Sequence, residues 1–261
     1  MPKVSVLMGV YNCSETLGRS IESIINQTFT DWEMIICDDG SSDNSAEIVV
    51  SYQAKDPRIV LLRNGENRGL AFTLNRCIEL SCGEYCARMD GDDVCAPDRF
   101  KKQVDFLDAH TEYGFVSTTM KRFDEYGVYQ DPEVQGLYEP VMKDYIKGSP
   151  FCHAPAMIRK KAYEAVGGYR DIEMTRQMED YDMWFRMYAA DIKGCIIREP
   201  LYSMFDGRSA AHRRTFKRRL NEAKVRREGY KAINAPAYAY LYIMKPVVLG
   251  LIPQWLYRLI R

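Results

Sequence analysis

GEYCARMDGDDVCAPDRF, residues 83–100, joins a short apolar run to a cluster of acidic residues. Tyr85–Met89 has the composition of a buried strand and runs directly into Asp90-Gly91-Asp92-Asp93. Pro97 then stands where the first turn of a helix tolerates proline, and apolar residues follow at helical spacing. The stretch therefore predicts a strand, an acidic turn and a helix in succession.

The same alternation of strand and helix extends from this stretch toward the N-terminus. Short apolar runs at Val4–Val10, Trp32–Cys37 and Ile59–Leu62 predict three further strands, each followed by apolar residues at helical spacing. Such alternation builds a parallel sheet with helices on both faces, and ligands bind beyond the carboxyl ends of its strands. We therefore expect Asp38-Asp39 and Asp90–Asp93 to share one edge of the sheet.

The second half of the chain is less regular. Its pattern predicts strands at Phe115–Met120, Phe123–Gln130, Ala156–Arg159 and Ile196–Glu199, and helices at Lys160–Val166 and Glu179–Ala190. In the first half, Ser14 precedes the first helical run, and we expect its side chain to cap that helix.

The charges are unevenly distributed, although Lys plus Arg equals Asp plus Glu at 36 each over 261 residues. Residues 1–206 contain 23 basic and 34 acidic residues, a net charge of −11. Residues 207–261 contain 13 basic and 2 acidic residues, a net charge of +11. A strongly basic end is typical of a segment that meets an anionic surface.

The N-terminus and the cysteines bear on the compartment. The opening residues MPKVSVLMGVYN lack the longer apolar stretch and the cleavage site of a secretory signal. The eight cysteines contain no C-x-x-C pair, which disfavours a zinc site and favours reduced thiols. Reduced thiols indicate a cytoplasmic protein.

Two interpretations of the acidic clusters stay open at this point. Carboxylates without His or Cys suit hard divalent cations such as Mg²⁺ or Mn²⁺, which are usually shared with the phosphates of a substrate. An acidic turn after a strand also caps the helix that follows. Spacing alone does not distinguish the two.

Several segments, in this order, resemble the inverting family 2 glycosyltransferases with a GT-A fold, and the resemblance covers about residues 1–205. They are VSVLMGVYN (4–12), INQTFTDWEMIICDDGSSD (25–43), NRGLAFTLN (67–75), GEYCARMDGDDVCAPDRF (83–100), HAPAMIRKKAYEAVGGY (153–169) and MEDYDMWFR (178–186). The resemblance implies an α/β, Rossmann-like fold with a mostly parallel central sheet flanked by helices. It implies a domain at 1–206, with a nucleotide-sugar-binding half at 1–108 and an acceptor-side half at 109–206. Residues 207–261 would form a basic, aromatic, helical extension.

The resemblance also assigns roles to matching positions. The donor nucleotide, its ribose and its diphosphate would be contacted by Tyr11, Asn12, Asp39, Arg68 and Asp90. The cofactor Mn²⁺ or Mg²⁺ would be held by Asp92 and Asp93, with Asp92 the first choice. Asp180, beside Glu179, would take the proton of the acceptor hydroxyl, and its place at a helix start would keep it ionised. The acceptor side would be lined by His153, Asp182 and Trp184. His212, among arginines, is a less favoured further metal ligand.

The basic end admits three interpretations. His212–Tyr230 contains eight Lys or Arg and two Glu, and residues 235–261 mix aromatic, basic and apolar residues. Its longest uninterrupted apolar run, Val247–Ile252, is far shorter than the roughly 20 residues of a spanning helix. This pattern favours a segment that lies on the membrane surface. Docking on the protein's own acidic body is the alternative, and nucleic-acid binding is disfavoured because no reading motif accompanies the charge.

These features predict a metal-dependent inverting glycosyltransferase at the inner face of the cell membrane. It would move a sugar from a nucleotide-diphosphate sugar, UDP-linked, to a hydroxyl of a lipid-linked or cell-surface glycan. One alternative is a sugar-phosphate nucleotidyltransferase, which would carry a glycine-rich basic loop where this chain has GVYNCSETL (9–17). The other is an inactive nucleotide-binding membrane adaptor, which would lack the acidic pairs.

Overall fold

The computed structural model describes residues 1–132, 135–206 and 215–251. Its first half contains four parallel strands, as the apolar runs predict: β1 (Val4–Val10), β2 (Trp32–Asp38), β3 (Ile59–Arg63) and β4 (Tyr85–Asp90). β1 lies between β2 and β4 and pairs in parallel with both, while β3 pairs with the far side of β2. The four strands therefore end at one edge of the sheet.

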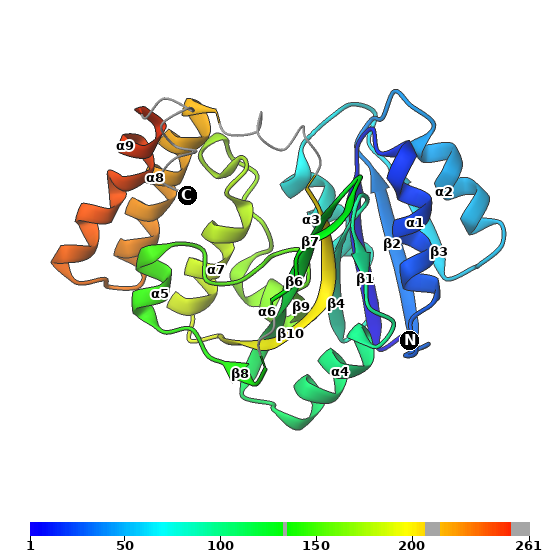
Figure 1. The fold of residues 1–261 in the computed structure, drawn as a ribbon, viewed down its shortest axis with the longest axis horizontal. Helices are drawn as coiled ribbons and strands as arrows, with labels where there is room; N and C mark the ends of the chain where they lie inside the picture. Colours follow the sequence, from blue (N-terminus) through cyan, green and yellow to red (C-terminus); the bar gives the residue numbers. More distant parts are fainter. Residues whose placement is uncertain (133–134, 207–214, 252–261) are drawn as a thin grey trace.

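Helices cover both faces of this sheet because its strands are apolar on both sides. The first-half helices are α1 (Ser14–Ile25), α2 (Ser45–Gln53), α3 (Leu70–Leu80) and α4 (Arg99–Ala109). Successive residues of β1 point to opposite faces, so Val6 joins the core under α1, α2 and α4, whereas Leu7 joins the core under α3. Figure 1 shows α1 and α2 on one side of the sheet and α6 (Lys160–Val166) and α7 (Glu179–Ala189) on the other.

The second half extends the same sheet with strands of mixed direction. They are β5 (Val94–Cys95), β6 (Tyr113–Asp124), β7 (Gly127–Gln130), β8 (Leu137–Tyr138), β9 (Met157–Arg159) and β10 (Lys193–Phe205). The sheet order is β3-β2-β1-β4-β9-β6-β10-β5, with β7 beside β6 and β8 beside β10. β9 runs antiparallel to both β4 and β6, whereas β6 and β10 are parallel to each other. The predicted α/β fold with a mostly parallel core flanked by helices is confirmed.

Three local predictions differ from the structure. β6 is one continuous strand, and β10 continues to Phe205, because the two strands pair with each other along almost their whole length. The Ser14 side chain does not cap α1. The backbone nitrogen of Ser14 donates instead to Asp43 Oδ2 at 3.0 Å. A carboxylate from the turn before α2 thus accepts the hydrogen bond of the first N–H group of α1.

The remaining helical segments lie on the side of the sheet that carries α7. They are α5 (Met142–Lys147), the short turns η1 (Glu173–Thr175) and η3 (Ala237–Ile243), α8 (Phe216–Ala232) and α9 (Lys245–Leu251). α8 packs on α7, and two of its side chains bind one carbonyl of α5. Arg226 Nη1 donates to the Ile146 oxygen at 2.8 Å, and Tyr230 Oη donates to the same oxygen at 2.7 Å. α8 therefore docks on the protein's own body.

In the described part of the chain, no helix is both long enough and apolar enough to cross a membrane. None of the eight cysteines forms a disulfide, and most of their side chains are buried.

Gly229 of α8 tests whether this docking contributes to stability. A Cβ at Gly229 would lie 2.2 Å from the ring of Phe185, which is buried in the core. We expect Gly229→Ala to lower the free energy of unfolding by about 1–3 kcal/mol, because the ring must move in a packed core. Urea unfolding followed by circular dichroism measures this change.

Gly18→Ala in α1 is the matched control, because a Cβ there meets only the Tyr52 hydroxyl, at 3.4 Å. It should leave stability unchanged or raise it by up to about 1 kcal/mol, as alanine favours the helix. Equal effects of the two substitutions would contradict the packing of α8 on α7.

Candidate active site

The carboxyl edge of the sheet brings three predicted segments together. In the pairing of β1 with its neighbours, Val10 lies opposite Asp38 and Gly9 lies opposite Asp90. The residues that follow β1, β2 and β4 therefore emerge side by side. This is the arrangement that the strand pattern predicts.

Asn12 ties the turn after β1 to the turn after β2. The side-chain oxygen of Asn12 accepts a hydrogen bond from the Ser42 backbone nitrogen at 2.8 Å, and the backbone nitrogen of Asn12 donates to Ser41 Oγ at 3.0 Å. Its φ of 50° is left-handed, a conformation that Asn tolerates better than most residues. Tyr11, before it, is half exposed, so an aromatic ring stands at the rim of this edge.

Asp39 is buried and holds the loop between β3 and α3. One carboxylate oxygen accepts from Asn64 Nδ2 at 2.6 Å and from the Arg68 nitrogen at 2.9 Å, and the other accepts from the Gly69 nitrogen at 2.8 Å. The Arg68 side chain is exposed, and its guanidinium lies 4.3 Å from the centre of the Phe72 ring. Asp39 thus presents Arg68 at the edge of the sheet, a role that the sequence did not indicate.

The acidic turn after β4 divides into outer and inner carboxylates. Asp90 is ion-paired with Arg88, and Asp92 is half buried. Asp93 is buried, and its Oδ1 accepts a hydrogen bond from the Phe205 nitrogen of β10 at 2.7 Å. Burial, with the charges of Asp90 and Asp92, raises the pKa of Asp93 to about 8. Asp93 is thus the inner carboxylate of the turn, and its assignment as a metal ligand stays a prediction.

Arg88 is a site residue that sequence reasoning missed. Its guanidinium is 1% exposed, pairs with Asp90 and donates to the Met89 carbonyl. Its positive charge is also the smallest of several influences on the pKa values of Glu179 and Asp180, which it lowers against the dominant effect of burial, so the start of α7 lies within electrostatic reach of Arg88. The available signal was a charged residue inside an otherwise apolar strand.

Glu179 and Asp180 open α7, as predicted. Glu179 Oε1 accepts from the Gln177 nitrogen at 2.9 Å, in the turn that precedes the helix. Backbone N–H groups at the helix start favour the carboxylates, but burial outweighs them and raises the pKa of both residues above the ordinary values. The helix start does favour the ionised form of Asp180, as expected, but burial raises its pKa above the ordinary value of an aspartate.

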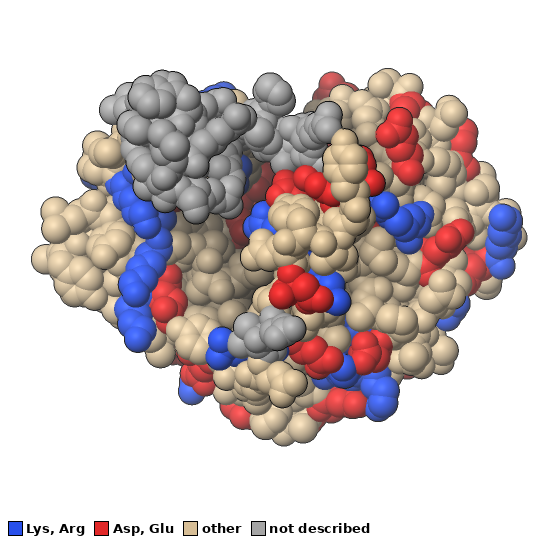
Figure 2. Space-filling model, viewed as in Figure 1, with Lys and Arg blue, Asp and Glu red and all other residues tan. Residues whose placement is uncertain are grey.

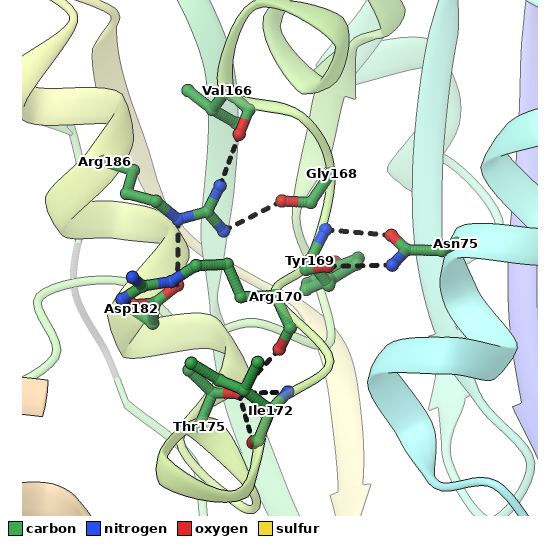
Figure 3. A network of polar contacts seen from close by, with 9 residues as sticks. All are labelled: Asn75, Val166, Gly168, Tyr169, Arg170, Ile172, Thr175, Asp182 and Arg186. Carbon is green, nitrogen blue, oxygen red and sulfur yellow. Dashed lines mark hydrogen bonds and ion pairs between the residues drawn. The ribbon is translucent and has the colours of Figure 1, made fainter.

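Asp182 does not line an acceptor site. It is 3% exposed, and both of its oxygens bind Arg170, while Oδ2 also accepts from Arg186 Nε at 2.8 Å. Arg186 in turn donates to the carbonyls of Val166 at 2.6 Å and Gly168 at 2.8 Å. Figure 3 shows this network joining α7 to the loop after α6. Asp182 is a structural residue that fixes that loop.

Trp184 is likewise not at an acceptor rim. It is completely buried and stacks on Phe115 of β6, with 4.8 Å between ring centres. Trp184 lies four residues after Asp180 on α7, but its side chain points into the core.

His153 lies beside the β4 turn and is half buried. Its Nε2 is 2.6 Å from the hydroxyl of Tyr169. Burial and the positive charge of Arg88 lower the pKa of His153 to about 3, so the imidazole is neutral at physiological pH. Its assignment to the acceptor side stays a prediction.

The sequence profile described as "Glycosyl transferase family 2" matches residues 5–167. The Bacillus subtilis protein EpsE, named as a glycosyltransferase, is 41% identical over 253 residues, which cover 97% of this chain and 90% of EpsE. The chain belongs to glycosyl transferase family 2. The Escherichia coli protein WfaP, named as a UDP-Glc:alpha-D-GlcNAc-diphosphoundecaprenol beta-1,3-glucosyltransferase, is 28% identical over 74% of this chain and 73% of WfaP.

Solved structures support the GT-A-like fold of this family 2 chain. S. aureus TarS in complex with UDP-GlcNAc superposes with a TM-score of 0.73 at 17% identity, over 95% of this chain and 71% of that one. The mannosyltransferase PcManGT of Pyrobaculum calidifontis, in complex with GDP-Man and Mn²⁺, superposes with a TM-score of 0.67 at 17% identity, over 99% and 78%. The predicted family, fold and enzyme class are confirmed, and the family favours glycosyl over nucleotidyl transfer.

Asp182 and Asp180, two positions apart in this glycosyltransferase's α7, allow a direct comparison of a structural and a site carboxylate. We expect Asp182→Ala to lower the free energy of unfolding by about 1–3 kcal/mol, because two arginines lose their shared acceptor. Thermal unfolding at neutral pH measures the difference.

Asp180→Ala should leave stability unchanged or slightly higher, because burial already disfavours that carboxylate. If Asp182→Ala proved as stable as the wild type, the structural role of Asp182 would be wrong.

Proposed function

We propose that the protein transfers a sugar, with inversion at the anomeric carbon, from a nucleotide-diphosphate sugar to a hydroxyl of a cell-surface or lipid-linked glycan. One observation carries this proposal. Arg88 pairs with Asp90 of the β4 turn, and the same charge acts on Glu179 and Asp180 at the start of α7. The β4 turn, through Asp90, and the candidate base Asp180 thus lie within electrostatic reach of the same buried cation.

Inversion requires a single displacement, and Asp180 supplies the base for it. The acceptor oxygen attacks the anomeric carbon while the bond from that carbon to the nucleoside diphosphate breaks, and the hydroxyl proton passes to Asp180. A raised pKa suits this role, because proton transfer is most efficient when the pKa of the base approaches the working pH. Burial and, to a smaller extent, the negative charge of Asp180 in turn raise the pKa of the neighbouring Glu179.

Asp90 and Asp92 suit a hard divalent cation, Mn²⁺ or Mg²⁺, by the chemistry of their oxygens. Within the described ranges, no group of three or more His, Cys, Asp or Glu side chains is arranged to hold a metal ion. Two protein carboxylates are enough when donor phosphates and water complete the coordination. A cation held there would neutralise the charge of the departing diphosphate. His212, the less favoured further ligand, lies outside the described residues.

The donor half offers contacts for the rest of the nucleotide. Arg68, presented by Asp39, can approach a diphosphate, and Tyr11 with Asn12 borders the same edge. A UDP-linked donor is supported by the names of two similar proteins, WfaP and the TarS complex with UDP-GlcNAc. WfaP is also named for a diphosphoundecaprenol acceptor, which supports a lipid-linked acceptor for this chain.

Peripheral membrane contact through residues 207–261 is part of the proposal. Apolar side chains of η3 and α9 are exposed, with Leu241 79% and Tyr238 56% accessible, and Met244 and Val248 accompany them. Figure 2 shows Lys and Arg side chains gathered over the α8 part of this face. Exposed aromatic and aliphatic groups beside basic ones suit an anionic lipid surface. We therefore place the enzyme at the cytoplasmic face of the membrane.

Thermal shift with UDP-sugars and Mn²⁺, followed by a transfer assay with a diphosphoundecaprenol-linked sugar, tests the catalytic proposal. We expect Asp180→Asn to lower kcat by about 10²–10⁴-fold, because the base is lost, while stabilisation by the donor persists. Asp92→Asn should abolish the part of that stabilisation that depends on Mn²⁺.

Asp105→Asn is the control, because Asp105 lies exposed on α4 and pairs only with Lys101 among the described residues. It should transfer at the wild-type rate. Transfer by Asp180→Asn at the wild-type rate would show that Asp180 is not the base. If the wild type transferred no sugar from any donor, the inactive adaptor would be favoured instead.

Flotation with vesicles tests the membrane contact. We expect the full-length protein to float with phosphatidylcholine vesicles that contain phosphatidylglycerol, and binding to weaken as salt rises. Tyr238→Ser combined with Leu241→Ser and Met244→Ser should abolish flotation, because the apolar contact is lost.

Tyr126→Ser combined with Val128→Ser is the matched control, because it removes exposed apolar groups from the β6–β7 hairpin instead. It should float as the wild type does. A wild-type protein that stays in solution with these anionic vesicles would refute the contact.

A further inference from the structure

A chain of three side chains runs from the core to the candidate site. The Tyr163 hydroxyl is 2.9 Å from the Tyr169 hydroxyl, which is 2.6 Å from His153 Nε2. Tyr163 is completely buried and Tyr169 is 2% exposed. Burial also keeps the pKa of both tyrosines above the ordinary value, so both hydroxyls stay protonated at neutral pH.

The direction of the hydrogen bonds between these three side chains follows from the requirement that each buried donor has an acceptor. If Nε2 of His153 carried the proton, Tyr169 would donate to Tyr163, and the Tyr163 proton would have no acceptor among the described residues. An unpaired buried donor costs about 1–3 kcal/mol. If Nε2 accepts instead, Tyr163 donates to Tyr169, Tyr169 donates to Nε2, and both buried hydroxyl protons are paired. The second arrangement is therefore the stable one, and it leaves the imidazole proton on Nδ1.

Tyr169 is held rigidly enough to impose this choice. Its backbone nitrogen donates to Asn75 Oδ1 at 2.9 Å, and its carbonyl accepts from Asn75 Nδ2 at 2.8 Å. On the other side, Arg186 of α7 binds the Gly168 carbonyl, as Figure 3 shows. Gly168 has φ +68°, and a Cβ there would lie 2.7 Å from Asn75 Oδ1. Side chains of α3 and α7 thus hydrogen-bond to the segment that carries Tyr169 from both sides.

His153 Nδ1 is available to a ligand. The described residues provide it with no hydrogen-bond partner, and it is not among the unpaired atoms that are sealed from solvent. The charges of Arg88 and Asp90 both act on the ring, so His153 lies beside the β4 turn. Trp184 flanks it edge-on, with 6.2 Å between ring centres.

We infer that Tyr169, backed by Tyr163, locks His153 in the neutral Nδ1–H form, and that Nδ1–H donates a hydrogen bond to a neutral oxygen of a sugar bound in the site. A neutral imidazole suits a hydroxyl or ring oxygen rather than a phosphate. Because Nδ1 already carries a proton and Nε2 is engaged, His153 does not compete with Asp180 for the acceptor proton. Tyr169 is a positioning residue that acts through His153. The inference rests on the proposed function for its ligand, but not for the lock itself.

Nitrogen NMR of the histidine side chains tests the lock without turnover. The chain has three histidines, at positions 110, 153 and 212, and His153→Asn identifies the signals of His153 by their loss. We expect the wild type to show a protonated Nδ1 and an unprotonated Nε2. Tyr169→Phe should give a mixture of tautomers, whereas Tyr163→Phe should keep the wild-type form, because Tyr169 still has only Nε2 to donate to.

Kinetics with paired substitutions test the ligand contact. The amide nitrogen of Asn occupies the position of Nδ1, and that of Gln occupies the position of Nε2. We expect His153→Gln and Tyr169→Phe to raise one KM by about 3- to 10-fold with kcat little changed, and His153→Asn to stay closer to the wild type. A change in the donor KM assigns the contact to the transferred sugar, and a change in the acceptor KM assigns it to the acceptor.

Three results would overturn the inference: a protonated Nε2 in the wild type, an unchanged tautomer in Tyr169→Phe, or a His153→Gln enzyme that is closer to the wild type than His153→Asn. The NMR result stands whether or not transfer is observed. A failure of the lock is therefore distinguishable from a failure of the proposed function.

Discussion

The parallel pairing of β1 with β2 on one side and β4 on the other is the constraint on which the site depends. Parallel strands direct their carboxyl ends to one edge, so Asn12, Asp39 and the acidic turn after β4 become neighbours although they are far apart in sequence. The pairing is stabilised by apolar residues on both faces of β1, which are buried in the two core clusters. A functional arrangement of polar groups is thus fixed by burial of apolar ones.

Polar residues behind this edge then hold the site in shape. The Asp39 carboxylate orders the loop that carries Arg68, and Asp182 orders the loop that carries Tyr169. Both are aspartates in positions where a functional role is easily assumed. Their buried oxygens instead accept hydrogen bonds from protein donors, and of the two side chains that they help to position, Arg68 is exposed whereas Tyr169 is buried. The division between supporting and exposed carboxylates is set by burial and not by residue type.

The parts of the fold that sequence predicted are those with a local signal. β1 to β4, the helices between them and the start of α7 follow from apolar periodicity within each segment. The length of β10, the inward turn of Asp93 and the ion pairs of Asp182 depend on partners far along the chain: Asp93, for example, meets Phe205. Arg88 was missed for a related reason. A cation inside an apolar strand has no periodic signature, and its pairing with Asp90 is visible only in three dimensions.

The shared carbonyl of Ile146 has a consequence for how this enzyme diversifies. Arg226 and Tyr230 of α8 both bind that oxygen, which belongs to α5, and the chain reaches His153 only a few residues later. α8 and the segment that leads from α5 to His153 are therefore structurally coupled and cannot be exchanged independently. A chimaera that takes α8 from a relative without the matching α5 leaves a buried arginine and a tyrosine without their acceptor. A lineage that exchanges α8 must therefore, on this architecture, revise α5 with it.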